Sequence, residues 1–175
     1  MLTVRPAAPD DLAAVAAIYA HYVTETVATF DETPPPLDAW HTRLADLNAR
    51  GLPFLVGEAE GQIAGYSYAA PWRAKPAYRH SVEDSVYLGQ EWAGRGFGTV
   101  LLQAVLDDCA KAGLRQVVAV IADTGSDASA ALHRKAGFTE AGRLTGVGYK
   151  HGRWIDTILM QHTLPQRPAA DPDRR

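Results

Sequence analysis

The sequence predicts an α/β fold in which a mixed β-sheet is flanked by helices. Residues 54–59 and 62–70 have the composition of strands and are joined by Glu60-Gly61, a pair typical of a tight hairpin, so these strands are expected to be antiparallel. A strand over 81–88, an apolar-striped helix and a strand over 116–122 follow in the order of a parallel crossover. With 175 residues, 47% of them hydrophobic, the chain has enough material for one such core.

The first third of the chain is expected to contain a short strand and two helices. Residues 2–5 form the predicted strand. Apolar residues then recur every three or four positions as far as Tyr22, which predicts an amphipathic helix. Three consecutive prolines make 23–36 a loop that presents Phe30, and a second helix is expected over 37–50.

The middle of the chain alternates irregular and regular segments. Residues 71–80 hold an aromatic and basic mixture, which suits either the binding of a small anion or an ordinary surface loop. The next helix carries a wide apolar stripe that includes Cys109, expected as a core residue, and ends at Gly113. The nearly continuous apolar run over 117–122 predicts a central strand covered on both faces.

The last part of the chain is expected to complete the sheet. A further helix ends at about Lys135, and two closing strands follow over 138–143 and 154–164. These elements complete a single domain over residues 1–164. The tail, 165–175, is predicted to be disordered.

Composition and charge exclude several classes of protein. Seventeen basic and 20 acidic residues give a formal net charge of −3, so no global positive field attracts nucleic acid or an anionic membrane, and neither partner is expected. A single cysteine forms no internal disulfide. Histidines such as His21, His41, His151 and His162 lack the spacing of metal ligands, so no metal site is expected. The sequence contains no secretory signal and no long apolar run, which predicts a cytoplasmic protein.

Three glycines in five residues, Gly94, Gly96 and Gly98, stand between a predicted strand and the start of a helix. Their backbone N–H groups are unobstructed by side chains, and the helix N-terminus adds partial positive charge, so a phosphate or pyrophosphate fits. The dinucleotide-binding fingerprint requires glycine where Thr99 stands, and the Walker A motif is absent. A glycine-rich connection that only lets helix and strand pack closely is the alternative.

Three segments, 85–88, 94–102 and 132–138, closely resemble the GNAT acetyltransferase superfamily. Segments over 28–32, 78–83, 150–154 and 160–161 resemble its phosphinothricin and methionine sulfone (or sulfoximine) acetyltransferase branch. The resemblance covers almost the whole chain as far as Leu164. It implies the GNAT fold, a mostly antiparallel twisted sheet with a splayed parallel strand pair and flanking helices, and an N-acetyltransferase that uses acetyl-CoA.

The resemblance also implies which residues hold acetyl-CoA. The backbone of Val86, Tyr87 and Leu88 is expected to bond the pantetheine arm, with the acyl group in the cleft that the splayed strands make. The loop expected to hold the pyrophosphate consists of Gly94, Arg95, Gly96, Phe97, Gly98 and Thr99. Ser126 replaces a cofactor-binding asparagine of the family, and Ala93 replaces a Gln or Arg, so both departures weaken the expected grip on the cofactor.

Acetyl transfer to an amine requires a neutral nitrogen, yet an amino-acid amine is mostly protonated at pH 7, so a base must take its proton. The resemblance implies that Glu83 is this base and acts through water; a solvated or ion-paired strand residue is the alternative. Strand alternation places Glu83 on the face of Ser85 and Tyr87, and puts Asp84 on the opposite face, where it is the poorer candidate. The N–H of Leu88 is a candidate donor to the developing oxyanion.

His133 occupies the position where the superfamily often has a tyrosine that protonates the departing thiolate. An imidazole can do the same or bond the sulfur of the cofactor. A surface or core histidine with a backbone partner is the alternative.

For the acceptor, the resemblance implies a mouth lined by Phe30, Trp72, Pro76, Ala77, Tyr78 and Arg79. Arginine is the best bidentate partner for a carboxylate, phosphinate or sulfone oxygen. The expected substrate is a small amino-acid analogue, such as phosphinothricin, methionine sulfoximine or methionine sulfone, acetylated on its α-amino group. A homodimer is implied by the resemblance alone. Trp154 is expected to be a packing residue, and a contribution to a subunit interface near the site is the alternative.

Two other interpretations remain open. The acceptor could instead be a protein N-terminus, a polyamine or an aminoglycoside, although a polycationic acceptor favours an acidic cleft and the segment 73–80 is basic. The chain could also bind coenzyme A without catalysis, with Ala93 and Ser126 as signs of relaxed constraint. The presence of Glu83 argues against that interpretation.

Overall fold

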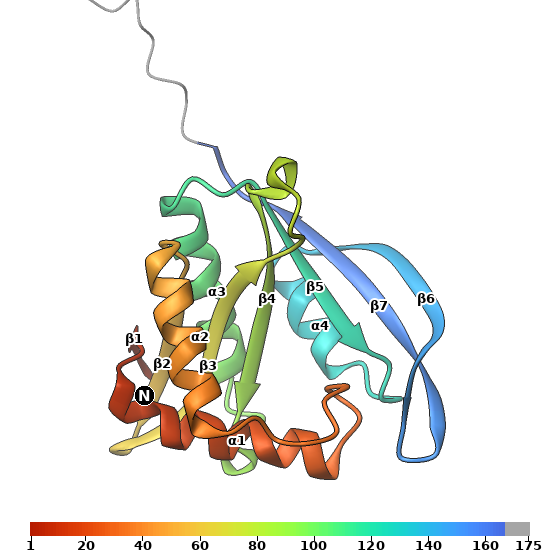
Figure 1. Cartoon of the computed structure of the whole chain (residues 1–175), viewed down its shortest axis with the longest axis horizontal. Helices are drawn as coiled ribbons and strands as arrows, with labels where there is room; N and C mark the ends of the chain where they lie inside the picture. Colours follow the sequence, from red (N-terminus) through yellow and green to blue (C-terminus); the bar gives the residue numbers. More distant parts are fainter. Residues whose placement is uncertain (167–175) are drawn as a thin grey trace, which may run out of the picture.

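Seven strands form one open sheet in the order β1-β2-β3-β4-β5-β7-β6 (Figure 1). The computed structural model describes residues 1–166, so the predicted disordered tail lies outside the described residues from 167 onward. The strands are β1 (Thr3–Pro6), β2 (Phe54–Ala59), β3 (Gln62–Pro71), β4 (Ser81–Leu88), β5 (Gln116–Ala122), β6 (Thr139–Lys150) and β7 (Arg153–Thr163). The α-helices of this part of the chain are α1 (Leu12–Glu25), α2 (Leu37–Ala49), α3 (Phe97–Lys111) and α4 (Ala128–Lys135).

The sheet is mixed, as the sequence predicts. Neighbouring strands of the described sheet are antiparallel except β4 and β5, which α3 connects as a parallel crossover. The β2–β3 hairpin turns at Glu60 and Gly61, whose φ angles are 53° and 75°. Two consecutive left-handed residues match the twist of a two-residue hairpin, so the predicted antiparallel pair is confirmed.

The parallel pair is splayed. On one side, β4 pairs with β3 along its whole length, from Val82 opposite Pro71 to Leu88 opposite Gly65. On the other side, its pairing with β5 ends at Glu83 opposite Val118. Beyond that point the two strands diverge and leave a V-shaped opening in the sheet (Figure 1), which confirms the fold that the family resemblance implies.

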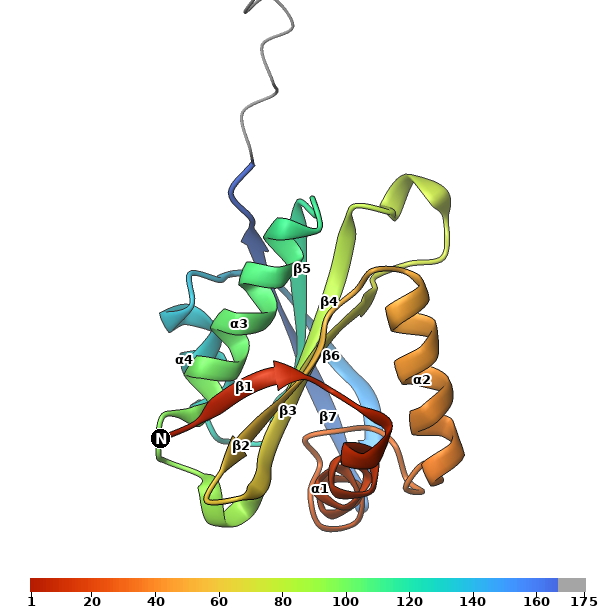
Figure 2. The same ribbon diagram turned by 90° about the vertical axis from the view of Figure 1, so that its left-hand side faces the viewer.

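Helices cover both faces of the sheet (Figure 2). Under α3 and α4, a core that includes Leu102, Val105 and Cys109 packs on β4 and β5, so the predicted core role of the cysteine is confirmed. Under α1 and α2, a second core contains Trp40 and Tyr66. No helix within residues 1–166 combines the length and the apolar character needed to cross a bilayer.

The last hairpin is longer than the sequence predicts. The closing strand expected over 138–143 continues to Lys150 as β6, and it turns at His151 and Gly152, both with positive φ. Register shifts interrupt its pairing with β7 between Glu140 and Gly142 and between Leu144 and Gly148. Bulges and glycines break the alternation on which strand prediction depends, so the pattern ends early.

The prediction that β5 is covered on both faces is wrong for one face. Val117, Ala119 and Ile121 are buried under the helices, whereas Val120 on the other face is 41% exposed. The reason is that the core under α1 and α2 contains no residue of β5, so that core does not cover this face of the strand. The exposed face of β5 therefore belongs to the candidate site.

Candidate active site

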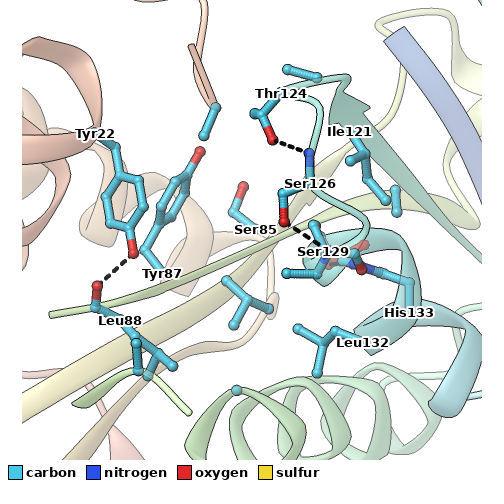
Figure 3. A pocket seen from close by; sticks show the side chains of 18 of the residues that line it. Tyr22, Ser85, Tyr87, Leu88, Ile121, Thr124, Ser126, Ser129, Leu132 and His133 are labelled. Carbon is cyan, nitrogen blue, oxygen red and sulfur yellow. Dashed lines mark hydrogen bonds and ion pairs between the residues drawn. The ribbon is translucent and has the colours of Figure 1, made fainter. Parts of the chain in front are cut away.

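A cavity of about 550 Å³ lies between the splayed strands. Its lining comes from four regions: β4, the glycine-rich turn before α3, β5 with the start of α4, and the end of α1 with the loop that follows it (Figure 3). The predicted site residues that line it are Glu83, Val86, Tyr87, Leu88, Gly94, Gly96, Gly98, Thr99, Ser126 and His133. The fold thus brings together residues that are up to 50 positions apart in the chain, from Glu83 to His133.

One edge of β4 presents backbone groups to the cavity. Gly89 N–H bonds to β3, so Leu88, one residue earlier, directs its own N–H and C=O away from β3. Its carbonyl accepts a hydrogen bond from Tyr22 Oη at 2.7 Å (Figure 3). By the same alternation the N–H and C=O of Val86 face the cleft, beyond the last pair with β5. An extended ligand could therefore bond to β4 as an added strand would.

The turn before α3 exposes its backbone. Gly94 and Gly96 have φ angles of 75° and 80°, in the left-handed region that favours glycine. A Cβ at either position would meet no atom within 4 Å, so it would project into open space. Gly96 is the N-cap of α3, where unpaired N–H groups and the helix dipole favour an anion.

Two residues of the predicted pyrophosphate loop direct their side chains elsewhere. Arg95 forms a 3.4 Å ion pair with Glu60 and lies over the ring of Trp92. Phe97 stacks on the same tryptophan, with ring centroids 5.9 Å apart. Neither residue lines the cavity, so any contact with a ligand there would come from their backbone groups.

The opposite wall is formed by the segment between β5 and α4. Thr124 Oγ1 accepts a hydrogen bond from Ser126 N–H, and Ser126 Oγ accepts one from Ala128 N–H, each at 3.3 Å (Figure 3). These hydroxyl groups satisfy backbone donors at the start of the helix, as capping residues do. Ser126 is therefore fixed at the cavity wall by its neighbours.

Glu83 lies at the closed end of the V, at the last pair between β4 and β5. Burial raises the pKa of its carboxyl group, and the neighbouring charge of Asp84 acts in the same direction, while Arg73 opposes them. Within the described residues no hydrogen bond perturbs this group. The pKa of Glu83 is therefore closer to neutral pH than that of an ordinary glutamate, which suits a general base.

Asp84 and His133 form a buried pair. His133 Nε2 lies 2.9 Å from Asp84 Oδ2, and their side chains are only 6% and 2% exposed. His133 Nδ1 lies 2.7 Å from the carbonyl oxygen of Ser129, which can only accept, so Nδ1 carries a proton. Burial would lower the pKa of His133, but the hydrogen bond and charge of Asp84, with the carbonyl of Ser129, raise it above its ordinary value.

This pairing bears on the predicted role of His133. Both ring nitrogens of His133 bond to protein groups, Nδ1 to a backbone carbonyl and Nε2 to Asp84. This arrangement agrees with the alternative interpretation, a core histidine with a backbone partner. Asp84, which the sequence ranks as the poorer base, lies on the opposite face from Glu83, as predicted, and is one of the cavity residues. Its Oδ1 atom is buried without a partner in the described part of the chain. Any proton from His133 Nε2 would thus pass by way of Asp84.

The predicted acceptor-site residues lie outside the cavity lining. Phe30 lies against Gly148 of β6, since a Cβ on that glycine would come within 2.4 Å of the ring. The others lie on the exposed connection between β3 and β4, which contains Trp72, Pro76, Ala77, Tyr78 and Arg79. Arg79 Nη1 donates to the carbonyl oxygen of Pro76 at 3.2 Å. From this connection it is Arg73 whose charge reaches Glu83.

Several cavity residues are not among the site residues that the sequence predicts. They are Tyr22, Ala28, Ala119, Val120, Ile121, Ala122, Thr124, Ala128, Ser129 and Leu132. Most are small or apolar, and their positions follow from the splay and not from a local pattern. The sequence places Tyr22, with its polar hydroxyl group, on the apolar face of a helix. The hydrogen-bond partner of that hydroxyl cannot be predicted locally, because it is a main-chain oxygen 66 residues away. Among residues 1–166, no group of three or more potential metal ligands is present.

Comparison with known proteins agrees with this geometry. The family model described as the acetyltransferase (GNAT) domain matches residues 4–159. A phosphinothricin N-acetyltransferase of Alcaligenes faecalis is 45% identical over 162 residues, which are 93% of this chain and 82% of that protein. An L-methionine sulfoximine/L-methionine sulfone acetyltransferase of Pseudomonas aeruginosa is 40% identical over 173 residues, with 95% and 98% coverage.

Solved structures show the same relationship. A phosphinothricin acetyltransferase from Sinorhizobium meliloti, in complex with AcCoA, superposes with a TM-score of 0.90 at 38% identity and covers 99% of this chain and 97% of its own. A structure from Brucella melitensis described as a ribosomal-protein-alanine N-acetyltransferase has a TM-score of 0.89 at 40% identity, with 93% and 99% coverage. The chain therefore belongs to the GNAT acetyltransferase family, in the branch of the phosphinothricin and methionine sulfoximine/sulfone acetyltransferases.

Proposed function

We propose that this enzyme moves the acetyl group of acetyl-CoA to the α-amino group of a small amino-acid analogue of the phosphinothricin, methionine sulfoximine or methionine sulfone type. One observation carries the proposal. The cavity combines an unpaired edge of β4, an open helix N-terminus and a half-buried carboxylate with raised pKa. These are the groups needed to hold an extended acyl carrier, to bind its phosphates and to deprotonate an amine.

The chain's residues fit acetyl-CoA. The cleft-facing backbone of Val86 can bond the pantetheine arm, and the N–H of Leu88 is left for the acetyl oxygen. The turn at Gly94 and Gly96 leaves room where side chains would obstruct a pyrophosphate. These contacts use backbone groups. The turn can therefore still bind a pyrophosphate although Ala93 lacks the longer Gln or Arg side chain of the family.

Acetyl-CoA supplies the acetyl group as a thioester. Glu83 takes a proton from the acceptor's ammonium group through a water molecule, which leaves a neutral nitrogen for attack. The N–H of Leu88 faces the cleft and can stabilise negative charge on the acetyl oxygen. The Asp84–His133 pair shares one proton, can deliver it to the departing thiolate and can regain one from the reacting nitrogen through water. Of the two protons that the ammonium loses, one goes to solvent and one to the thiol.

The basic connection between β3 and β4 supports an anionic acceptor. Arg73 acts on Glu83, so a guanidinium lies near the proposed base, and Lys75 and Arg79 belong to the same segment. A carboxylate, phosphinate or sulfone oxygen would bind there while the amine faces Glu83. The names of the two curated relatives support the same class of acceptor.

We also propose a homodimer. Exposed apolar side chains gather on the β6–β7 hairpin, where Leu144, Val147, Tyr149 and Trp154 are 47% to 71% exposed. Such a cluster on one hairpin is typical of a protein contact. A sedimentation measurement that gives the mass of one chain at micromolar concentration would exclude this assembly.

The acceptor class is tested by a coupled thiol-release assay of the full chain with acetyl-CoA. The panel contains phosphinothricin, methionine sulfone, methionine sulfoximine, a polyamine and peptides with different N-termini. Highest kcat/KM for the sulfone, sulfoximine or phosphinate is the expected result. Preference for a peptide N-terminus would replace the proposed acceptor, and saturable acetyl-CoA binding without turnover of any acceptor would indicate a non-catalytic module.

A further inference from the structure

Lys150, near the end of β6, is a buried cation remote in sequence from every proposed catalytic residue. It is only 3% exposed, and its Nζ donates a hydrogen bond to the carbonyl oxygen of Thr29 at 2.8 Å. Burial lowers the pKa of this lysine, while the charges of Asp31 and Glu32 oppose that effect. Burying an ammonium group is costly unless it makes a needed contact, so the contact with the loop between α1 and α2 requires an explanation.

The same loop is attached to α1 on its other side. Tyr19 Oη lies 2.7 Å from Thr29 Oγ1 and donates to Asp31 Oδ2 at 2.6 Å. The ring of Tyr19 contacts the ring of Tyr87 edge-on, with centroids 5.2 Å apart. Since Tyr87 lines the cavity, a continuous set of contacts runs from the loop to the cavity wall.

A third attachment lies next to Lys150 on the same strand. The ring of Phe30 lies so close to Gly148 that a Cβ there would approach it to 2.4 Å. Gly148 and Lys150 are two residues apart, so they share one face of β6, and that face meets the loop. By contrast, a Cβ on Gly142, in the same strand, meets no atom within 4 Å.

The attached loop lies at the wide end of the V. Together with the end of α1 it lies across the region between the diverging ends of β4 and β5 (Figure 1), and Thr29 and Phe30 contact the β6–β7 hairpin. Ala28, the residue before Thr29, lines the cavity, as does Tyr22 near the end of α1. A displacement of the loop would therefore move one wall of the site.

We propose that Lys150 is a positioning residue for the acceptor: with Gly148, it fastens the loop 26–36 to β6 and so holds Phe30 and the adjoining wall in place. The inference rests on the proposed function, because it takes the acceptor to bind in the cavity that Ala28 of this loop and Glu83 both line. Lys150 acts through Thr29 and does not touch the reacting atoms. The cofactor contacts proposed on β4 and at the start of α3 are made by backbone groups of other segments, so we expect acetyl-CoA binding to change less than acceptor binding.

The test compares Lys150→Met, which keeps the length but removes the charge, with Lys150→Arg, which keeps a cation. We expect Lys150→Met to raise the acceptor KM about tenfold or more, since small misplacements of a bound substrate have large effects on rate. The dissociation constant of acetyl-CoA should stay within about twofold of wild type, and Lys150→Arg should recover most of the acceptor KM. Amide hydrogen exchange over 26–36 should accelerate in Lys150→Met.

Gly148→Ala and Gly142→Ala give a matched pair in the same strand. Gly148→Ala must displace Phe30 and should raise the acceptor KM, whereas Gly142→Ala has room for the methyl group and should not. The inference is overturned if Lys150→Met leaves both the acceptor KM and the exchange of 26–36 unchanged, or weakens acetyl-CoA binding as much as acceptor binding. Hydrogen exchange tests the attachment even if no acceptor is turned over, so failure of the proposed function remains distinguishable.

Discussion

Glu83 and Asp84 are adjacent carboxylates on β4, yet their environments differ in every respect that matters for proton transfer. Glu83 is half-buried, unbonded within the described residues, and raised in pKa mainly by burial. Asp84 is buried on the opposite face and bonded to His133. The alternation of side chains along the strand separates a carboxylate that is free to exchange protons from one that is held in a pair.

The backbone of β4 shows the same contrast between its two edges. The edge toward β3 is paired from Val82 to Leu88, while the edge toward β5 is free beyond Glu83. The paired edge supplies rigidity and the free edge supplies binding groups. A single eight-residue strand thus combines a fixed framework with an open site.

Replacement of the free carboxylate should have the largest effect. Glu83→Gln keeps the shape but cannot accept a proton, so kcat should fall about 10²- to 10⁴-fold near pH 7, the range typical of general-base loss. In the wild type, activity should rise with pH through the raised pKa of Glu83, and this limb should disappear in the variant. Steady-state rates from pH 5 to 9 check both statements.

A matched control is Glu140→Gln, which removes an exposed carboxylate from β6. It should leave the rate and the pH profile unchanged. Acetyl-CoA affinity should also be unchanged in Glu83→Gln. An unaltered acidic limb in that variant would remove Glu83 from its proposed role.

Replacement of the held carboxylate should remove the proposed proton donor to the thiolate and should also lower stability. Asp84→Ala leaves His133 buried without its partner and should cost about 3 kcal/mol of unfolding free energy. The pKa of His133 is raised in the folded state, so the stabilisation is complete below its unfolded pKa of about 6.5 and is lost as pH rises through the folded value. The destabilisation should therefore be larger at about pH 6 than at about pH 9.

Asp84→Asn separates charge from hydrogen bonding. The amide can donate to a neutral Nε2, so it should be less destabilising than alanine but should abolish the raised pKa of His133. Urea unfolding at both pH values and NMR titration of the imidazole measure these effects. A destabilisation that does not vary with pH would show that the pair contributes through packing alone.

The sequence predicts the sheet where local patterns are strong. The apolar run over 117–122 and the turn at Glu60-Gly61 are sufficient to locate β5 and the first hairpin. The end of β6 is missed because glycines and bulges there remove the alternating pattern. The exposed face of β5 is missed because burial depends on how far the core under α1 and α2 extends across the sheet.

The same division holds for the site. Glu83 and Gly96 belong to compact motifs, so sequence analysis selects them. The hydrogen bond between Asp84 and His133 joins residues 49 positions apart, and no local sequence pattern predicts it. Phe30 is predicted as a residue that its loop presents to the acceptor; it lies outside the cavity lining, and its contact with Gly148 depends on the course of β6.

The smallest expected effect concerns the glycine turn, because a change there leaves both carboxylates in place. Gly96→Val puts a β-branched residue at φ of 80° and projects methyl groups into the cradle, so the dissociation constant of acetyl-CoA should rise about tenfold, equivalent to about 1.4 kcal/mol. Gly113→Val, beyond the other end of α3, imposes the same backbone strain at φ of 78°, with equal room for the side chain. Gly113→Val should lower the stability of the protein without weakening the binding of acetyl-CoA. Calorimetric titration of both variants with acetyl-CoA separates backbone strain from obstruction of the cradle. Equal affinities in the two variants would place the phosphates away from this turn. A loss of acetyl-CoA affinity confined to Gly96→Val, with an unchanged pH profile of activity, would separate cofactor binding from the proton chemistry of Glu83 and Asp84.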